Sequence, residues 1–276
     1  MKRYPWPLLV LIYSVLIGAA GIVLYPVLRV VSTSVRPFDK ILTTGLGLIP
    51  QDATLDNYKR IFTSEPFLLW ISNSLLVTGV TAYLSVSIAA ISAYALTRWR
   101  FPMRRLILLS IFFVQLIPGS VMLVPTYLMV MKLNLVNTYA GLLLSYAVGT
   151  VPFSIWLLRG YFSGIDVSAE EAAMIDGAGP IRIFYSILLP QAMPVIGVVF
   201  ILSVMAGWSE YILARMVLVD QTLYTWPLGL NRFSSQYQTL WGVYSASSVV
   251  ISIPAVLVFL WVAPQLHRGL SSGLKS

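Results

Sequence analysis

The sequence predicts an all-α membrane protein with six transmembrane helices. Three observations lead to this fold class: apolar residues make up 58% of the chain, charged residues only 10%, and the mean hydropathy is +0.84. A soluble globular domain has about 25% charged residues. Several apolar runs also reach the length of about 20 residues that a helix needs to cross a bilayer. They are too long and too continuous for the strands of a membrane barrel, so we predict a helical bundle.

Six apolar runs define the expected spans. Each is long enough to cross about 30 Å of hydrocarbon as a helix. We expect residues 1–276 to form a single transmembrane domain. The predicted spans are 8–30, 70–96, 106–131, 139–159, 191–214 and 241–263.

The first run could be mistaken for a cleavable signal peptide, because Lys2 and Arg3 precede it. The apolar region of a signal peptide has about 7–15 residues. This run continues through Leu28. We therefore predict an uncleaved membrane anchor.

Basic residues in the short connections predict the orientation of the spans. The connection 97–105, between the second and third spans, carries four arginines, whereas the connection 132–138 carries a single lysine. Short loops rich in Lys and Arg remain in the cytoplasm. We therefore expect both termini in the cytoplasm, together with the loop 160–190 between the fourth and fifth spans.

The loop 160–190 contains a compact acidic segment. Ser168 is expected to cap a short helix, while Glu171, three residues later, reaches back in a capping box. The adjacent Glu170 also favours the positive end of the helix dipole. Gly177, followed by a Gly-Pro pair, is expected to end the helix. The segment is either an ordinary interfacial helix with solvated acids or a docking element for a partner in the water.

The composition excludes several kinds of chemistry. The chain has no cysteine and one histidine, which excludes thiolate ligands and leaves no set of histidines for a metal site. No segment has the order of strand, glycine-rich loop and helix that a nucleotide-binding site needs. The net charge of +8 follows from basic residues beside apolar runs. We therefore expect no catalytic site, no metal and no nucleic-acid partner.

Polar residues within the predicted spans are candidates for a solute pathway. An ionisable side chain inside a membrane is costly and indicates a functional position. Glu210, in the predicted fifth span, is such a residue, and at helical spacing it shares a face with Ser203 and Gly207. Gln115 belongs to a weaker polar stripe on the third span. These residues either form a packed gate between helices or contact the solute directly.

The spacing of residues in the loop 160–190 resembles the EAA loop of permease subunits from binding-protein-dependent ABC importers. The residues that carry the resemblance are Glu171-Ala172-Ala173, Asp176-Gly177-Ala178, Phe184, Ile187 and Leu189-Pro190. Other segments are similar to the carbohydrate importers of this family, above all to the smaller, six-span subunit of the maltose-transporter type. They are Leu55–Tyr58, Asn73–Leu75, Ser92–Leu96 with Arg98, and Trp208–Tyr211, in which Ser209 departs from the usual Asn.

The resemblance implies a type I ABC importer permease fold in the plasma membrane of a bacterium or archaeon. It implies that this chain binds no cofactor, and that two cytoplasmic ATPase subunits hold ATP and Mg²⁺. A second homologous permease chain, membrane lipid and an extracytoplasmic solute-binding protein are the other implied partners. The residues implied in coupling to the ATPase are Glu170, Glu171, Ala172, Ala173, Asp176, Gly177, Arg182, Leu189 and Pro190.

The implied function is the ATP-driven import of a disaccharide or oligosaccharide. Similar permeases carry glycerol phosphate or a related polyol, so this solute class remains an alternative. A more distant alternative is an ion-coupled secondary transporter, which would use Glu210 as its ion site and would need no docking loop. A membrane scaffold without transport activity is the last alternative.

Overall fold

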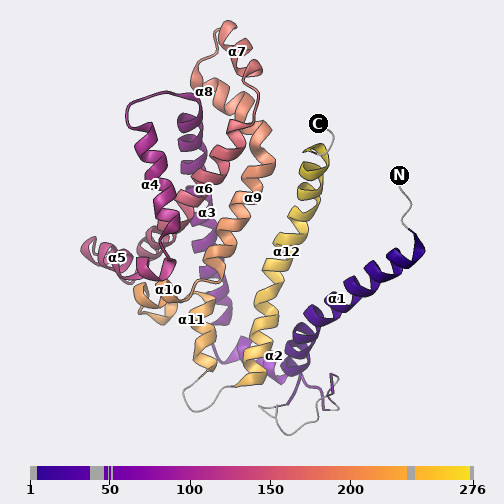
Figure 1. Ribbon diagram of the computed structural model, residues 1–276. Helices are drawn as coiled ribbons and strands as arrows, with labels where there is room; N and C mark the ends of the chain where they lie inside the picture. The colour runs from indigo at the N-terminus through magenta and orange to yellow at the C-terminus, as the bar shows by residue number, and fades with distance from the viewer. Residues whose placement is uncertain (1–4, 38–46, 49, 51, 235–239, 274–276) are drawn as a thin grey trace. The chain divides into compact units, whose positions relative to one another are not determined.

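The computed structural model describes residues 5–37, 47–48, 50, 52–234 and 240–273, which form helices joined by short connections (Figure 1). Within this part of the chain, five helices are long and apolar enough to cross a membrane, or six if one bent pair counts as a single span. The predicted helical class is therefore confirmed. The exact number of spans stays a prediction.

Four helices follow the predicted spans and extend beyond them at one or both ends. Hydropathy reports only the part of a helix that fits the hydrocarbon, whereas helical hydrogen bonding continues into the polar flanks. These helices are α1 (Trp6–Ser34), α3 (Phe67–Arg98), α6 (Tyr139–Ser163) and α12 (Trp241–Gly273).

Shorter elements connect and complete these helices. They are α2 (Asp56–Thr63), α4 (Arg104–Leu116), α5 (Gly119–Lys132), α7 (Ser168–Ile175), α8 (Pro180–Ile183), the π-helical turn η1 (Phe184–Leu188), α9 (Leu189–Trp208), α10 (Ile212–Val217), α11 (Trp226–Leu230) and the 3₁₀ turns η2 (Gln221–Leu223) and η3 (Asn231–Phe233).

The range predicted as the third span, 106–131, does not form one helix. It contains α4 and α5, which are bent by 111° at the break between them. Ile117 has extended backbone angles, and Pro118 follows it. A proline lacks the backbone N–H and disfavours helical angles at the residue before it, so α4 ends there. The range predicted as the third span is therefore broken at Pro118, and whether α4 and α5 form one span stays a prediction.

The range predicted as the fifth span, 191–214, also contains a break. α9 ends before Glu210, and α10 begins after it. The Glu210 carboxylate accepts hydrogen bonds from the backbone N–H groups of Leu213 (3.0 Å) and Ala214 (3.1 Å). A side chain that accepts from the first N–H groups of a helix stabilises its start. Glu210 therefore lies between two helices and not, as predicted, inside one.

The chain, predicted as one domain, divides into two compact units. One unit holds 1–68 with 229–253, and the other holds 69–228 with 254–276. Whether they act as one domain stays a prediction. In the second unit, buried residues of α3, α6, η1 and α9 form a common core, in which small side chains allow the helices to approach closely. Members of this core include Ala89, Ala93, Leu96, Leu158, Phe162, Leu188, Ala192 and Val199.

A buried asparagine organises the first unit. The Asn57 amide donates to the carbonyl oxygens of Ser34 (2.9 Å) and Arg36 (2.8 Å), which follow each other closely at the end of α1. The Tyr58 hydroxyl lies 2.8 Å from Ser34 Oγ. A Cβ atom at Gly242 would come within 2.7 to 3.0 Å of the Asn57 side chain, so this position of α12 has room only for glycine.

A second asparagine, near the start of α3, also joins two segments of the chain through its amide group. The Asn73 amide donates to the carbonyl oxygens of Thr222 and Tyr224, at 2.9 Å in both cases. The neighbouring Ser74 Oγ accepts from the backbone N–H of Trp226 at 2.8 Å. These bonds fix the chain before α11 against α3, which gives a structural role to the Asn73–Leu75 segment.

Candidate functional site

The predicted loop helix exists and is α7. Together with α8 it extends past the ends of α3, α6 and α9 within the second unit (Figure 1). Gly177 follows it with φ +82°, in the left-handed region that glycine adopts without strain. The N–H of Gly177 donates to Met174 (3.0 Å) and that of Ala178 to Ala173 (2.8 Å), which is the Schellman closure of a helix end. The loop helix thus ends as the sequence predicts.

The start of α7 differs from the predicted capping box. Ser168 is the first helical residue, and its Oγ donates to the Asp166 carboxylate at 2.8 Å. Asp166 also accepts the backbone N–H of Ser168 at 3.2 Å. The bond from the Ser168 side chain and then that from its backbone lower the pKa of the Asp166 carboxyl. The prediction is wrong because Val167, and not Ser168, is the N-cap, and no side-chain cap bond forms at this helix start.

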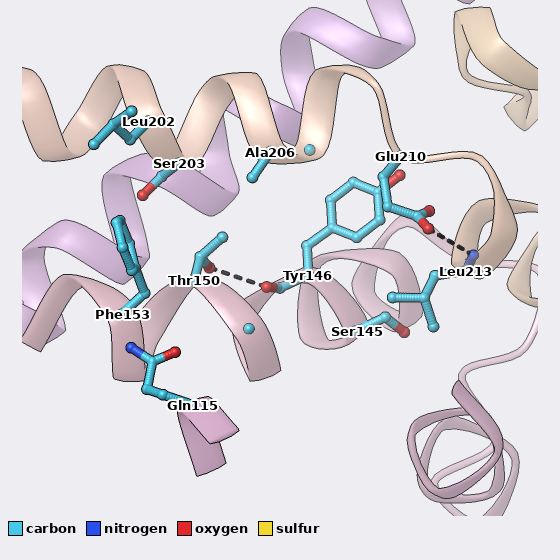
Figure 2. Close-up of a pocket in the computed structure, with 12 residues that line it drawn as sticks. Gln115, Ser145, Tyr146, Thr150, Phe153, Leu202, Ser203, Ala206, Glu210 and Leu213 are labelled. Atoms are coloured by element: carbon cyan, nitrogen blue, oxygen red, sulfur yellow. Dashed lines mark hydrogen bonds between the residues drawn. The ribbon is translucent and has the colours of Figure 1, made fainter. Parts of the chain in front are cut away.

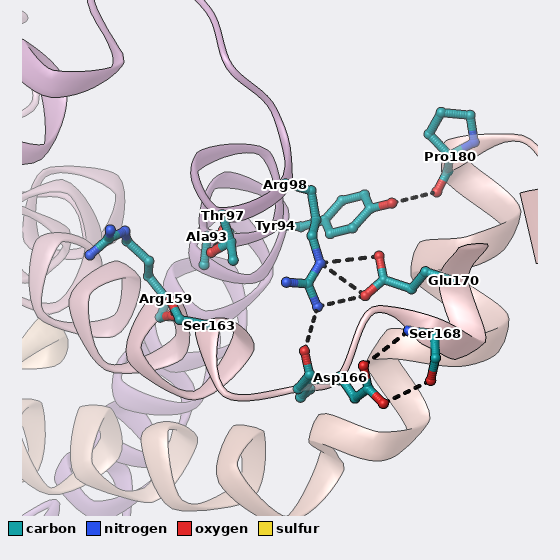
Figure 3. A network of polar contacts seen from close by, with 11 residues as sticks. Ala93, Tyr94, Thr97, Arg98, Arg159, Ser163, Asp166, Ser168, Glu170 and Pro180 are labelled. Atoms are coloured by element: carbon teal, nitrogen blue, oxygen red, sulfur yellow. Dashed lines mark hydrogen bonds and ion pairs between the residues drawn. The ribbon is translucent and has the colours of Figure 1, made fainter.

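The two adjacent glutamates of α7 have opposite environments. Glu170 is 2% exposed, and its carboxylate forms an ion pair with Arg98 at the end of α3 (Figure 3). Glu171 is exposed. Of these two glutamates, Glu171 is therefore the one that can reach another protein, while Glu170 is engaged inside the chain.

Three of the other residues predicted for coupling lie around a hollow beside α7. Asp176, Ala173 and Arg182 line a hollow of about 250 Å³ between α7 and the segment that follows it. Beside it, Ile175 is 88% exposed and Ile181 is 77% exposed. Large apolar side chains exposed to this extent are available for contact with another protein. Among the remaining predicted residues, Ala172, Gly177 and Pro190 are exposed and Leu189 is partly buried.

The second candidate site is a cavity of about 380 Å³ in the second unit (Figure 2). Its walls come from α6, α9, the end of α4 and the start of α10. They meet because α6 packs against α4, α9 and α10. The cavity brings together all four residues predicted for the pathway: Gln115, Ser203, Gly207 and Glu210.

The sequence analysis missed the wall that α6 contributes. Tyr146, Thr150 and Phe153 line the cavity from this helix. Tyr146 is 5% exposed and its ring points toward Glu210 (Figure 2). Among the described residues, its hydroxyl has no hydrogen-bond partner. The signal that could have found this wall is the spacing of the three residues, which puts polar and aromatic groups on one helical face.

Glu210 is held in place beside the cavity. Its two oxygens each accept one N–H at the start of α10, whereas a carboxylate has about four acceptor positions. It can therefore accept further hydrogen bonds from donors within the cavity. Hydroxyl groups of Ser145, Thr150 and Ser203 add polar surface to the same cavity.

Gly207 sets the distance between α9 and its neighbours. A Cβ atom there would lie 3.1 Å from Thr78 Cγ2 and 3.2 Å from Tyr146 Cδ2. Both distances are closer than ordinary contact between carbon atoms. One turn earlier, the buried Ser203 Oγ lies 3.4 Å from Ser154 Oγ on α6. The shape of the cavity therefore depends on a glycine at this position.

Sequence comparisons connect this chain with transport proteins. Residues 85–272 match the family described as binding-protein-dependent transport system inner membrane component. The chain is 34% identical over 270 residues to the maltose/maltodextrin transport system permease protein MalG of Escherichia coli strain K12, which covers 91% of this chain and 90% of the relative. The protein of the same name from Vibrio vulnificus strain YJ016 is 34% identical over 272 residues, covering 92% and 90%.

Solved structures share the fold. A chain from a bacterial ABC transporter involved in the import of the acidic polysaccharide alginate matches with a TM-score of 0.83 at 24% identity, covering 96% of this chain and 99% of that one. A chain of the inward-facing MetNI methionine ABC transporter matches with a TM-score of 0.57 at 15% identity, covering 75% and 99%. At these identities the likeness shows the fold alone.

Proposed function

This chain belongs to the family of binding-protein-dependent transport system inner membrane components, and from that premise we propose that it is the permease subunit of an ABC importer that carries a sugar across the bacterial inner membrane. Identity to maltose/maltodextrin permeases over about nine-tenths of both chains supports a sugar as the solute. The structural observation that carries the proposal is α7, a short exposed helix closed by Gly177 and followed by an exposed apolar tip.

The proposal includes partners that supply what this chain lacks. Two cytoplasmic ATPase subunits bind ATP and Mg²⁺, a second homologous permease chain completes the pathway, and a solute-binding protein delivers the sugar from outside. In this arrangement the chain has six spans, of which α4 and α5 form one broken span. Both termini and the loop 160–190 lie in the cytoplasm, which the four arginines of 97–105 support.

In this proposal α7 carries the motion of the ATPase into the membrane. Glu171 is exposed and contacts a basic group of the ATPase, while the small side chain of Ala172 allows close approach. Ile175 and Ile181 bury their exposed side chains in the partner. A short helix with closed ends moves as a rigid body, so it transmits displacement better than a flexible loop.

The cavity is the proposed place where this chain meets the solute pathway. Gln115, Ser203 and Glu210 offer hydrogen-bond partners, and Gly207 sets its width. Glu210 acts there either as part of a gate or as a direct sugar contact. Glycerol phosphate and related phosphorylated polyols fit less well, because the side chains that line the cavity include a carboxylate and no basic group.

The proposed function is tested by assembling the complete importer. We expect the chain to co-purify with an ATPase encoded by its own system and, with the second permease chain and the binding protein, to import radiolabelled maltose or maltotriose into proteoliposomes only when ATP is inside. Omission of the binding protein is the control and should abolish uptake. Uptake by this chain alone, driven by an ion gradient, would instead establish a secondary transporter.

Substitution of Glu210 separates its two proposed roles. Glu210→Ala removes the acceptor for two N–H groups of α10, each bond being worth about 1 kcal/mol, and should lower the initial rate of uptake about ten-fold. A direct sugar contact predicts a higher KM, whereas a gate predicts a lower kcat with faster ATP hydrolysis in the absence of sugar. Normal uptake by Glu210→Ala would remove this residue from the pathway.

A further inference from the structure

An ion pair between the partly buried Arg98 and the buried Glu170 joins the end of α3 to the loop helix. Arg98 Nη2 lies 2.6 Å from Glu170 Oε1, and Arg98 Nε lies 2.9 Å from Oε1 and 3.1 Å from Oε2 (Figure 3). The side chains are 14% and 3% exposed. Hydrogen bonds from two guanidinium nitrogens fix the orientation of the carboxylate as well as its distance. α7 is therefore attached rigidly to a helix from which 72 residues separate it in sequence.

Further contacts join the same part of α3 to the loop on both sides of α7. Arg98 Nη2 also donates to the carbonyl of Ile165 at 3.2 Å, before α7 begins. The Tyr94 hydroxyl donates to the carbonyl of Pro180 at 3.5 Å, after α7 has ended. The Tyr94 ring lies 5.3 Å from that of Phe184. The last turns of α3 thus contact the loop before, within and after α7.

The middle of α3 contacts the walls of the cavity. Ser85 Oγ and Thr150 Oγ1 lie 2.8 Å apart, in a buried position between α3 and α6. Thr78 lies against Gly207 of α9, where a Cβ atom would come within 3.1 Å of Thr78 Cγ2. One helix therefore contacts both candidate sites: the loop helix at its end and the cavity along its middle.

We propose that Arg98 and Glu170 are positioning residues that make α3 the helix through which the displacement of α7 reaches the cavity. This inference rests on the proposed function, since it assigns the route of coupling within the same importer. α6 and the helical segment that leads into α9 continue from the loop in sequence, but they are joined to α7 by the non-helical turns 164–167 and 176–179. The ion pair has no such freedom, because separating it would leave a buried charge without its partner.

Charge exchange in the complete importer tests the proposal. Arg98→Glu and Glu170→Arg should each reduce the sugar imported per ATP hydrolysed about ten-fold, because each places like charges together in a buried position. The double variant restores an opposite pair and should recover most of this ratio. Arg98→Lys keeps the charge but loses the two-nitrogen geometry and should give an intermediate ratio. Arg105→Gln, an exposed arginine in the same connection, is the matched control and should leave the ratio unchanged.

The ratio is measured on importers that still contain the ATPase, so a role limited to folding would lower the yield and not the ratio. Unchanged ratios in both single variants, or a double variant no better than either, would overturn the proposal. If the unsubstituted chain shows no ATP-dependent uptake at all, the proposed function fails instead, independently of the ion pair.

A distance measurement tests the rigid attachment even if the charge variants do not assemble. The chain has no cysteine, so Ala169→Cys on α7 and Arg100→Cys beyond α3 give a unique pair of spin labels. Their separation should stay constant when ATP is added to the otherwise unsubstituted importer, and should change when Arg98→Gln is also present. A separation that changes with ATP while Arg98 is intact would show that α7 moves independently of α3.

Discussion

Replacement of Gly177 by valine is expected to uncouple ATP hydrolysis from sugar uptake while the chain remains in the membrane. Gly177 has φ +82°, and no neighbouring atom lies within 4 Å of where its Cβ would be. Valine at this position therefore destabilises the turn through its backbone angles and not through a steric collision. For a β-branched residue this strain is about 1–3 kcal/mol. The strain should open the closing turn of α7 and lower the sugar imported per ATP about ten-fold.

A neighbouring glycine provides the control for this experiment. Gly179 is equally free of atoms around its Cβ position, but its φ is −76°, which any residue adopts before a proline. The importer with Gly179→Ala should therefore import as much sugar per ATP hydrolysed as the unsubstituted importer does. Glu171→Lys, which reverses an exposed charge without backbone strain, should also uncouple the importer. Full coupling in both Gly177→Val and Glu171→Lys would refute the docking role of α7.

Gly207→Val is expected to destabilise the second unit and to block uptake. A Cβ atom at this position would lie 3.1 Å from Thr78 Cγ2 and 3.2 Å from Tyr146 Cδ2, so the larger valine side chain requires these side chains or α9 itself to shift. Overpacking of this kind costs about 1–3 kcal/mol. Thermal unfolding of the purified chain in detergent should show the loss, and uptake by the assembled importer should fall with it.

Gly149, which lines the same cavity, provides the control for Gly207→Val. Gly149 lies on α6, and no atom is within 4 Å of its Cβ position. Gly149→Val carries the same intrinsic cost of a β-branched residue in a helix without the collision, so it isolates the steric effect. Equal unfolding temperatures for the two variants would show that α9 does not depend on this close approach.

Local signals were enough to predict the class of the chain and the end of the loop helix. Gly177 could be identified because the turn that it forms depends only on residues next to it. Prolines were less informative. Pro26, Pro125, Pro152 and Pro194 lie inside helices, whereas Pro118 separates two helices. The same residue type has both outcomes because neighbouring helices decide whether the freed backbone groups are satisfied.

Contacts between distant segments could not be predicted. Nothing near Glu170 in the sequence distinguishes it from Glu171, since the difference arises from Arg98 on another helix. Likewise, Tyr146 lines the cavity because α6 packs against α9, and this contact between helices cannot be read from the residues near Tyr146. Helical spacing grouped Ser203 with Gly207 and Glu210 correctly in space, although Glu210 reaches the cavity from a break and not from the helix itself.

The break between α4 and α5 restricts which side of the second unit can face lipid. At about 1.5 Å per residue, their 13 and 14 residues give about 20 Å each, less than the roughly 30 Å of hydrocarbon. In the proposed six-span arrangement, the last carbonyls of one helix and the first N–H groups of the other fall at membrane depth, where lipid offers them no hydrogen bonds. Gln115, Ile117 and Gly119 line a second hollow there, so acyl chains must be kept from this side by water or by another protein.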